Sequence, residues 1–173
     1  MTRSDSDETT QLMKSLVSRT VMDIESLGSE AVNQLAPFKA KTADLPGLTE
    51  FDAPVFLKEM TSGIFLATEL QSRLAYLEQK AVTDRKRIEA LCGLEKFPVW
   101  AKERGVKGTN DERTLFISLQ QEVVSARECE AQLGSLLLYV SGVKFALIST
   151  HDDCRKIHYS GHQSRQDFGK VFS

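Results

Sequence analysis

Residues 54–93 carry one sustained helical pattern, which limits the possible folds more than any other feature of the chain. Apolar residues recur there at alternating spacings of four and three, so they lie on one side of a long α-helix. A helix of roughly 38 residues is about 57 Å long, and its apolar side needs helical partners along this length. The members of this seam are Phe56, Met60, Gly63, Ala67, Leu70, Leu74, Leu77, Ala81, Asp84, Ile88 and Leu91.

The same spacing predicts a second long helix over residues 110–157. Thr109 or Asn110 can cap it, with Glu112 in its first turn. The first long helix covers residues 53–93, with Asp52 as its cap and Pro54 in its first turn. Two amphipathic helices joined by residues 94–109 predict an all-α fold built on a long antiparallel hairpin. The second seam contains Phe116, Leu119, Val123, Ala126, Leu133, Leu137, Val140 and Leu147.

The remaining sequence divides into an N-terminal extension and a C-terminal tail. Residues 1–48 predict one helix, which begins near Glu8 and ends at Pro37, followed by a linker. Residues 49–159 form the predicted hairpin core. Residues 160–173 show no clear period, and both a flexible tail and a partner-docking segment fit them.

Several apolar residues of the second helix lie outside its narrow seam. A two-helix hairpin cannot bury so wide an apolar surface, and exposed patches of this kind usually mark protein interfaces. We therefore expect a homo-oligomer, in the form of a ring or bundle. The expected interface residues are Leu136, Leu138, Tyr139, Val143, Phe145 and Ile148.

Composition predicts a soluble intracellular protein. No run of 18 apolar residues is present and the first ten residues are polar, so neither a membrane span nor a secretory signal is expected. The chain has an odd number of cysteines, and they lie far apart in the sequence, which favours reduced thiols in the cytoplasm. These residues are Cys92, Cys129 and Cys154.

The net charge of −2 conceals an uneven distribution of charge. Residues 1–79 hold 7 basic and 12 acidic side chains, whereas residues 80–113 hold 9 basic and 6 acidic ones. Basic residues repeat every seven positions beside the first seam, and the connection adds more of them together with an aromatic residue. Such an arrangement fits a nucleic-acid backbone, and it equally fits a solvated helix face. The candidate contacts are Arg73, Lys80, Arg85, Lys86, Arg87, Lys96, Trp100, Lys102, Arg104 and Lys107.

Trp100 and its neighbour Phe97 have two interpretations. Aromatic side chains between cations can stack on the bases of a single strand. Buried aromatic residues more often serve as packing anchors, which here would fix the connection to the helix ends.

The chain shows no catalytic motif, and we expect neither enzymatic activity nor a cofactor. Asp84, the carboxylate within the first seam, is interpreted as a residue that fixes helix register. His151, Cys154 and His158 are three and four residues apart, a spacing that zinc ligands can adopt. The same positions continue the seam of the second helix, so no metal site is predicted.

Two stretches give residues 49–159 a resemblance to the UvsY family of phage recombination mediators. The first is RKRIEALCG at residues 85–93, whose basic, hydrophobic and acidic residues and glycine follow the family pattern. The second runs from residue 118 to residue 157 through GSLLLYVSG at 134–142. It closes with a basic pair before Ile157. The family's aromatic pair before the glycine is replaced here by Ala90 and Leu91.

The resemblance implies a helical protein that forms a ring and binds single-stranded DNA. Proteins of this family help a RecA-type recombinase to load on DNA coated with single-stranded-DNA-binding protein, in the cytoplasm of the host cell. The family's DNA-contacting basic pair corresponds to Arg85 and Arg87. A second hypothesis is a phage structural or adaptor protein that binds a partner through its apolar helix faces, and a third is a metal-dependent enzyme that uses His151, Cys154 and His158.

Overall fold

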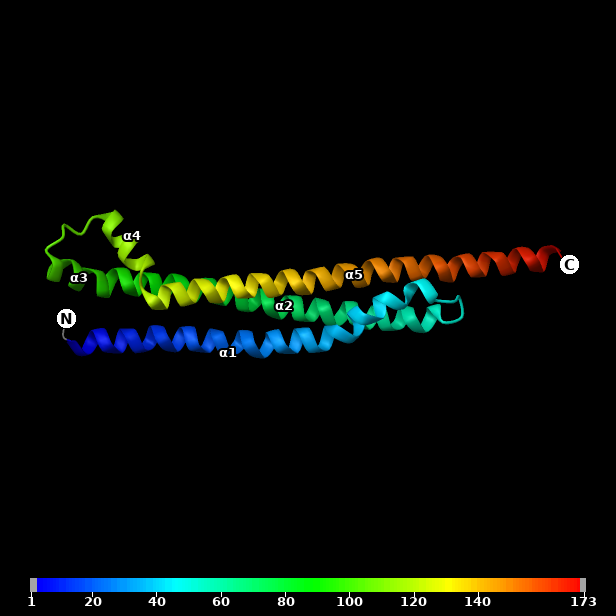
Figure 1. Ribbon diagram of the computed structural model, residues 1–173, viewed down its shortest axis with the longest axis horizontal. Coiled ribbons are helices and arrows are strands. Elements are labelled where there is room, and N and C mark those ends of the chain that lie inside the picture. The colour runs from blue at the N-terminus through cyan, green and yellow to red at the C-terminus, as the bar shows by residue number, and fades with distance from the viewer. Residues whose placement is uncertain (1–2, 172–173) are drawn as a thin grey trace. The chain divides into compact units, whose positions relative to one another are not determined.

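The computed structural model describes the backbone of residues 3–171 and the side chains of residues 7–160, and within that part of the chain it contains only helices and their connections (Figure 1). The expected all-α class is therefore confirmed. The helices are α1 (Arg3–Lys41), the 3₁₀ helix η1 (Thr42–Gly47), α2 (Ala53–Leu91), the π turn η2 (Cys92–Lys96), α3 (Phe97–Arg104), α4 (Asn110–Ser118) and α5 (Gln121–Val171).

The helices pack as two compact units, each of which combines segments distant in sequence. Unit 1 contains Met1–Leu27 and Leu74–Leu136, and unit 2 contains Gly28–Arg73 and Leu137–Ser173. Each of α1, α2 and α5 therefore contributes one part of its length to each unit.

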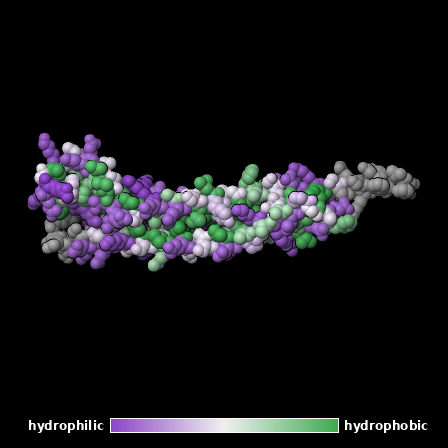
Figure 2. Space-filling view, viewed as in Figure 1, coloured by the Kyte–Doolittle hydropathy of each residue, from purple (hydrophilic) through white to green (hydrophobic). Residues whose placement is uncertain are grey.

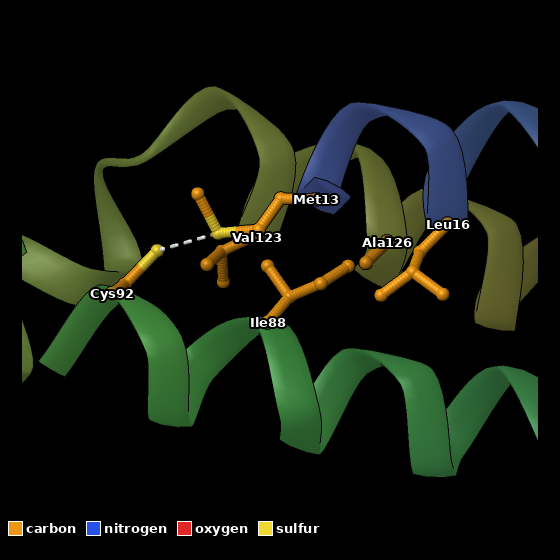
Figure 3. Packing of buried hydrophobic residues seen from close by; sticks show 6 residues of the cluster. All are labelled: Met13, Leu16, Ile88, Cys92, Val123 and Ala126. Carbon is orange, nitrogen blue, oxygen red and sulfur yellow. Dashed lines mark hydrogen bonds between the residues drawn. The ribbon is translucent and has the colours of Figure 1, made fainter. Parts of the chain in front are cut away.

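The core of unit 1 joins three long helices. Met13 and Leu16 from α1 meet Ile88 of α2 and Val123 of α5, with Cys92 at one end of the cluster (Figure 3). The Cys92 Sγ and Met13 Sδ atoms are 3.6 Å apart within this core. Burial of each large apolar side chain here contributes about 1.5–3 kcal/mol, so α1 is an integral layer of the unit.

Polar contacts in unit 1 show that α1 and α2 are antiparallel. Thr9 near the start of α1 donates a hydrogen bond to Glu95 after the end of α2. Further along α1, Asp23 accepts a hydrogen bond of 3.0 Å from Lys80 of α2. Residue numbers rise along one helix as they fall along the other.

Unit 2 has the same antiparallel pairing. Gly63 of α2 lies where a Cβ atom would be 2.8 Å from Cδ1 of Phe38 on α1 and 3.1 Å from Cδ1 of Leu147 on α5. The lack of a side chain at Gly63 therefore allows these helices to approach closely. The Cys154 thiol of α5 donates to the Ala53 carbonyl oxygen at 3.6 Å, which fixes α5 against the start of α2.

The predicted helix over residues 53–93 is present as α2, but the helical path continues beyond it through Gly93 and Pro98. After Leu91 the chain forms η2, in which the Phe97 amide donates to the Cys92 carbonyl, five residues earlier. This wider turn suits Pro98, which has no amide proton and whose ring conflicts with an α-helical carbonyl four residues before it. α3 then continues to Gly105, whose φ of 65° ends it.

The predicted single helix over residues 110–157 is wrong. The Thr109 capping box with Glu112 is present, but α4 ends at Ser118, and Leu119, expected in the buried seam, is 71% exposed. α5 begins at Gln121 after a turn. No proline or glycine marks this break. Figure 1 shows α4 at an angle to the start of α5. Phe116 packs on the aromatic rings of α3 instead of continuing the seam.

The N-terminal helix is longer than predicted, because Pro37 lies inside α1 and does not end it. Leu35 is fully buried and Phe38 packs beside Gly63, so tertiary packing holds the helix past the proline. Part of the expected linker is thus the end of α1, and another part is η1. At the other end of the chain, the backbone of α5 extends through the expected tail to Val171. The side chains from residue 161 onward lie outside the described residues.

Part of the apolar surface that led us to expect an oligomer is buried within the chain. Val143 was expected outside the seam of the second helix, but it is 5% exposed and belongs to the buried core. The prediction of an interface role for Val143 is therefore wrong. The predicted seam passed through Lys144 between Val140 and Leu147, but packing buries Val143 at this turn of the helix instead.

One part of α5, within Gln121–Ser160, is long and apolar enough to cross a membrane by length and composition alone. This finding is weak evidence for a membrane span, because core helices of soluble proteins meet the same criterion. Within Gln121–Ser160, Leu133, Val140 and Leu147 are fully buried, while only 28% of the apolar window is buried inside the structure.

Substitution of Gly63 tests the close approach of helices in unit 2. Gly63→Ala should lower the free energy of unfolding by about 1–3 kcal/mol, because its Cβ would lie 2.8 Å from Phe38 and 3.1 Å from Leu147. Gly142→Ala is the matched control, since an added Cβ there meets nothing within 4 Å. It should raise stability by about 0.5–1 kcal/mol through helix propensity. Urea unfolding followed by circular dichroism measures both, and equal effects would contradict the close approach.

Candidate nucleic-acid interface

Carboxylates from neighbouring helices neutralise several of the cations that the sequence proposed as nucleic-acid contacts. In unit 1, Lys80 of α2 lies 3.0 Å from a carboxylate oxygen of Asp23 on α1. In unit 2, Arg73 of α2 donates two hydrogen bonds to Glu30 of α1, at 2.7 and 2.9 Å. Asp23 and Glu30 are seven residues apart, as are Arg73 and Lys80, so matching repeats on α1 and α2 form these pairs.

Arg85 lies at the centre of a larger ionic network in unit 1. Its Nε donates to Glu130 of α5 at 2.6 Å, and its Nη1 donates to both oxygens of Glu89 at 3.0 and 3.1 Å. Arg127 of α5 also donates to Glu89, at 3.0 Å. Arg85 is thus held between α2 and α5, and its side chain is only 21% exposed.

The network stabilises the charged forms of its members. The hydrogen bond with Glu130 raises the pKa of Arg85 against the opposing effect of burial. Burial opposes ionisation of Glu89, but the hydrogen bonds from Arg127 and Arg85 outweigh it and leave the pKa of Glu89 below its usual value. The resemblance assigned a DNA contact to Arg85, yet in the free chain this guanidinium already has anionic partners.

Lys96 is paired with a carboxylate and largely shielded from solvent. Its ammonium group is 3.7 Å from Glu122 at the start of α5, and the two side chains are 16% and 11% exposed. Lys96 therefore links η2 to α5, and it presents little of its charge to solvent.

Lys86 and Arg87 form the part of the α2 stripe that remains accessible. Both side chains are exposed, and neither has an ion pair or hydrogen bond within the described part of the chain. Lys102 of α3 and Lys107 after it are exposed in the same way. These four residues are named the open cations. All belong to unit 1, and all retain their full capacity to contact a phosphate.

Trp100 packs within a cluster of three aromatic rings. Its ring centroid is 5.8 Å from that of Phe97 and 5.1 Å from that of Phe116 on α4. The Arg104 guanidinium lies 5.7 Å from the Trp100 ring centroid. Phe97 is 6% exposed. This geometry favours the packing-anchor interpretation of both aromatic residues, because their neighbours occupy the ring surfaces that a base would need.

The end of unit 1 formed by η2, α3 and α4 also exposes apolar side chains, which sequence reasoning missed. Leu94 is 67% exposed, Leu115 61% and Leu119 71%. Figure 2 shows hydrophobic and hydrophilic side chains intermixed at this end. No signal in the sequence marked Leu119 as exposed, because its spacing continued the predicted buried pattern.

The residues proposed for self-association differ in exposure. Leu138 and Phe145 of α5 are each 76% exposed in unit 2, and Ile148 is 39% exposed. Leu136 of unit 1 and Tyr139 of unit 2 are half-buried, and the Lys39 ammonium lies 5.6 Å from the Tyr139 ring centroid. The strongest candidates for an interface are therefore Leu138 and Phe145.

The His and Cys positions near the end of α5 follow the buried seam. Cys154 is fully buried, whereas His151 lies 3.6 Å from Asp152 and His158 packs beside Tyr159. Burial raises the pKa of the Cys154 thiol, which disfavours the thiolate that a metal requires. Among the described residues, no group of three or more His, Cys, Asp or Glu side chains converges.

Lys96 should behave as a structural residue. Lys96→Ala should lower the free energy of unfolding by about 1–3 kcal/mol, since it leaves Glu122 shielded from water without its partner. Lys102→Ala, which removes an equal charge at an exposed site, should change stability by less than about 0.5 kcal/mol. Urea unfolding of both variants distinguishes the roles, and equal stability would contradict the assignment for Lys96.

No family model, curated protein or solved structure matches the chain. The relation to the mediator family therefore stays a prediction from the residues that suggested it.

Proposed function

We propose that this chain is a non-enzymatic protein that binds single-stranded DNA through the open cations Lys86, Arg87, Lys102 and Lys107. The observation that supports this proposal most is that these four cations are exposed and have no anionic partner among the described residues, in a unit where Lys80 and Arg85 are paired. Lysine and arginine side chains in this state supply the phosphate contacts that dominate nucleic-acid affinity. Lys86 and Arg87 lie on α2 and Lys102 lies on α3, whereas Lys107 lies in the loop that follows α3.

The wider role proposed is that of a recombination mediator, and it rests on the resemblance in residues 85–93 and 118–157. In this role the protein helps a RecA-type recombinase to displace single-stranded-DNA-binding protein and to load on the strand. The binding step requires no cofactor or metal. Its site of action is the host-cell cytoplasm.

A homo-oligomeric ring completes the proposal. Leu138 and Phe145 are large apolar side chains seven residues apart on α5, and both are 76% exposed. Copies of the chain joined through this surface would present several sets of open cations. Linked sets of weak phosphate contacts bind more tightly than one set, because the later contacts form at high effective concentration.

The same exposed residues also support the second hypothesis, an adaptor protein. In that case Leu138 and Phe145 bind a different protein, and the open cations only maintain solubility. The two functions differ in their dependence on salt, because phosphate contacts release counterions and protein contacts through apolar side chains do not.

The open cations are tested by Lys86→Ala/Arg87→Ala in a fluorescence-anisotropy titration of labelled oligo-dT. Wild-type affinity should fall as salt rises, and the variant should lose at least about tenfold at low salt, with a shallower salt dependence. Lys58→Gln/Arg155→Gln removes two exposed cations from unit 2 and should retain most of the affinity. Absence of wild-type binding at low salt would leave the adaptor as the better account.

Self-association is tested by Leu138→Ser/Phe145→Ser, with the mass in solution measured by sedimentation. The variant should dissociate towards the monomer, because each serine removes about half or more of the apolar area that the leucine or phenylalanine would bury in the interface. Phe65→Ser, at a 72% exposed position of α2, is the matched control and should keep the wild-type mass. A monomeric wild type would contradict the ring.

A further inference from the structure

Two cations of α2 in unit 1 are paired with carboxylates, one from α1 and one from α5. Lys80 pairs with Asp23 of α1 at 3.0 Å, and Arg85 pairs with Glu130 of α5 at 2.6 Å. Both cations lie on the helix that also carries Lys86 and Arg87. The chain thus holds open cations next to cations that are already occupied by anions.

A carboxylate and a phosphate use the same donors of lysine and arginine. The side chains of these pairs are partly accessible, with exposed fractions of 33% and 38% for Lys80 and Asp23, and of 21% and 32% for Arg85 and Glu130. Solvent-exposed ion pairs are worth only about 0.2–1 kcal/mol. The more accessible Lys80–Asp23 pair lies closer to that case, whereas the less accessible Arg85–Glu130 pair is held more strongly and should exchange second.

The helices do not depend on these pairs for their packing. Met13, Leu16 and Ile24 hold α1 by apolar burial, and Val123 and Leu133 hold α5. An exchange of partners at Lys80 or Arg85 therefore requires a change of side-chain position and no separation of helices. Arg85 also retains Glu89, on its own helix, when Glu130 is displaced.

We propose that Asp23 and Glu130 are internal competitors for phosphate, which occupy Lys80 and Arg85 until a nucleic acid displaces them. This inference rests on the proposed function. Lys86 and Arg87 make the first phosphate contacts, and the paired cations add theirs only when the strand replaces the carboxylates. Asp23 and Glu130 thereby lower the affinity for any polyanion and limit its salt dependence.

Unit 2 contains a comparable pair. Arg73 donates two hydrogen bonds to Glu30, and the hydrogen bond from this arginine lowers the pKa of Glu30. The pair keeps Glu30 ionised and thus able to compete with a phosphate for the same guanidinium.

The test compares oligo-dT affinity across a salt series for Asp23→Asn/Glu130→Gln and for the control Glu25→Gln/Glu128→Gln. The control removes the same charge from the same two helices, two residues away in each case. Both control positions are exposed and have no ion pair within the described residues. The control therefore measures the general effect of two fewer negative charges.

The Asp23→Asn/Glu130→Gln variant should bind about two- to tenfold more tightly than the control at low salt. The slope of log affinity against log salt should steepen by up to about 0.7 for each freed cation. When Lys80→Gln/Arg85→Gln is combined with it, the gain should disappear. Circular dichroism should show wild-type helix content in every variant, since the apolar packing is unchanged.

Two results overturn the inference in distinguishable ways. If the wild type binds and both acidic variants gain equally, Asp23 and Glu130 act only through overall charge, and the proposed function stands without the competition. If the wild type and every variant fail to bind at low salt, the proposed function fails and the competition fails with it.

Discussion

The burial of the apolar seam of α2 between α1 and α5 is the interaction on which each unit depends. In unit 1 this seam supplies Ile88 to a core shared with Met13 and Val123. In unit 2 it supplies Gly63, where the other two helices approach closely. Each buried leucine or isoleucine contributes about 1.5–3 kcal/mol, several times the value of an exposed ion pair. Apolar packing therefore holds the helices together, and the charged residues between them are available for other contacts.

The basic residues of α2 fall into two groups, those that lie beside a carboxylate of a neighbouring helix and those that do not. Lys80 and Arg85 lie next to carboxylates, whereas Lys86 and Arg87 extend into solvent. A list of basic residues along one helix thus overstates the charge that a ligand meets. The same cations can stabilise the contacts of α1 and α5 in the free chain and contact a polyanion after an exchange of partners, because both states use the same hydrogen-bond donors.

Aromatic and apolar residues at the end of unit 1 have a similar division of roles. Trp100 and Phe97 form a ring cluster with Phe116, which fixes α4 on α3. Leu115 and Leu119, nearby in sequence, are exposed. The cluster gives Phe116 a packing site on α3 in place of the continued seam, which accompanies the break between α4 and α5.

The sequence by itself determined the helical class, the extent of α2 and its buried positions, because a four-and-three repeat has one helical solution and local spacing encodes it. It also identified the Thr109 capping box, whose partners are three residues apart. Only the tertiary structure decided that α1 continues past Pro37, that the chain turns at Leu119, that Val143 is buried, and which cations meet Asp23, Glu122 and Glu130. Each of these depends on a contact between residues distant in sequence, and the spacing within one helix carries no information about what another helix places opposite it.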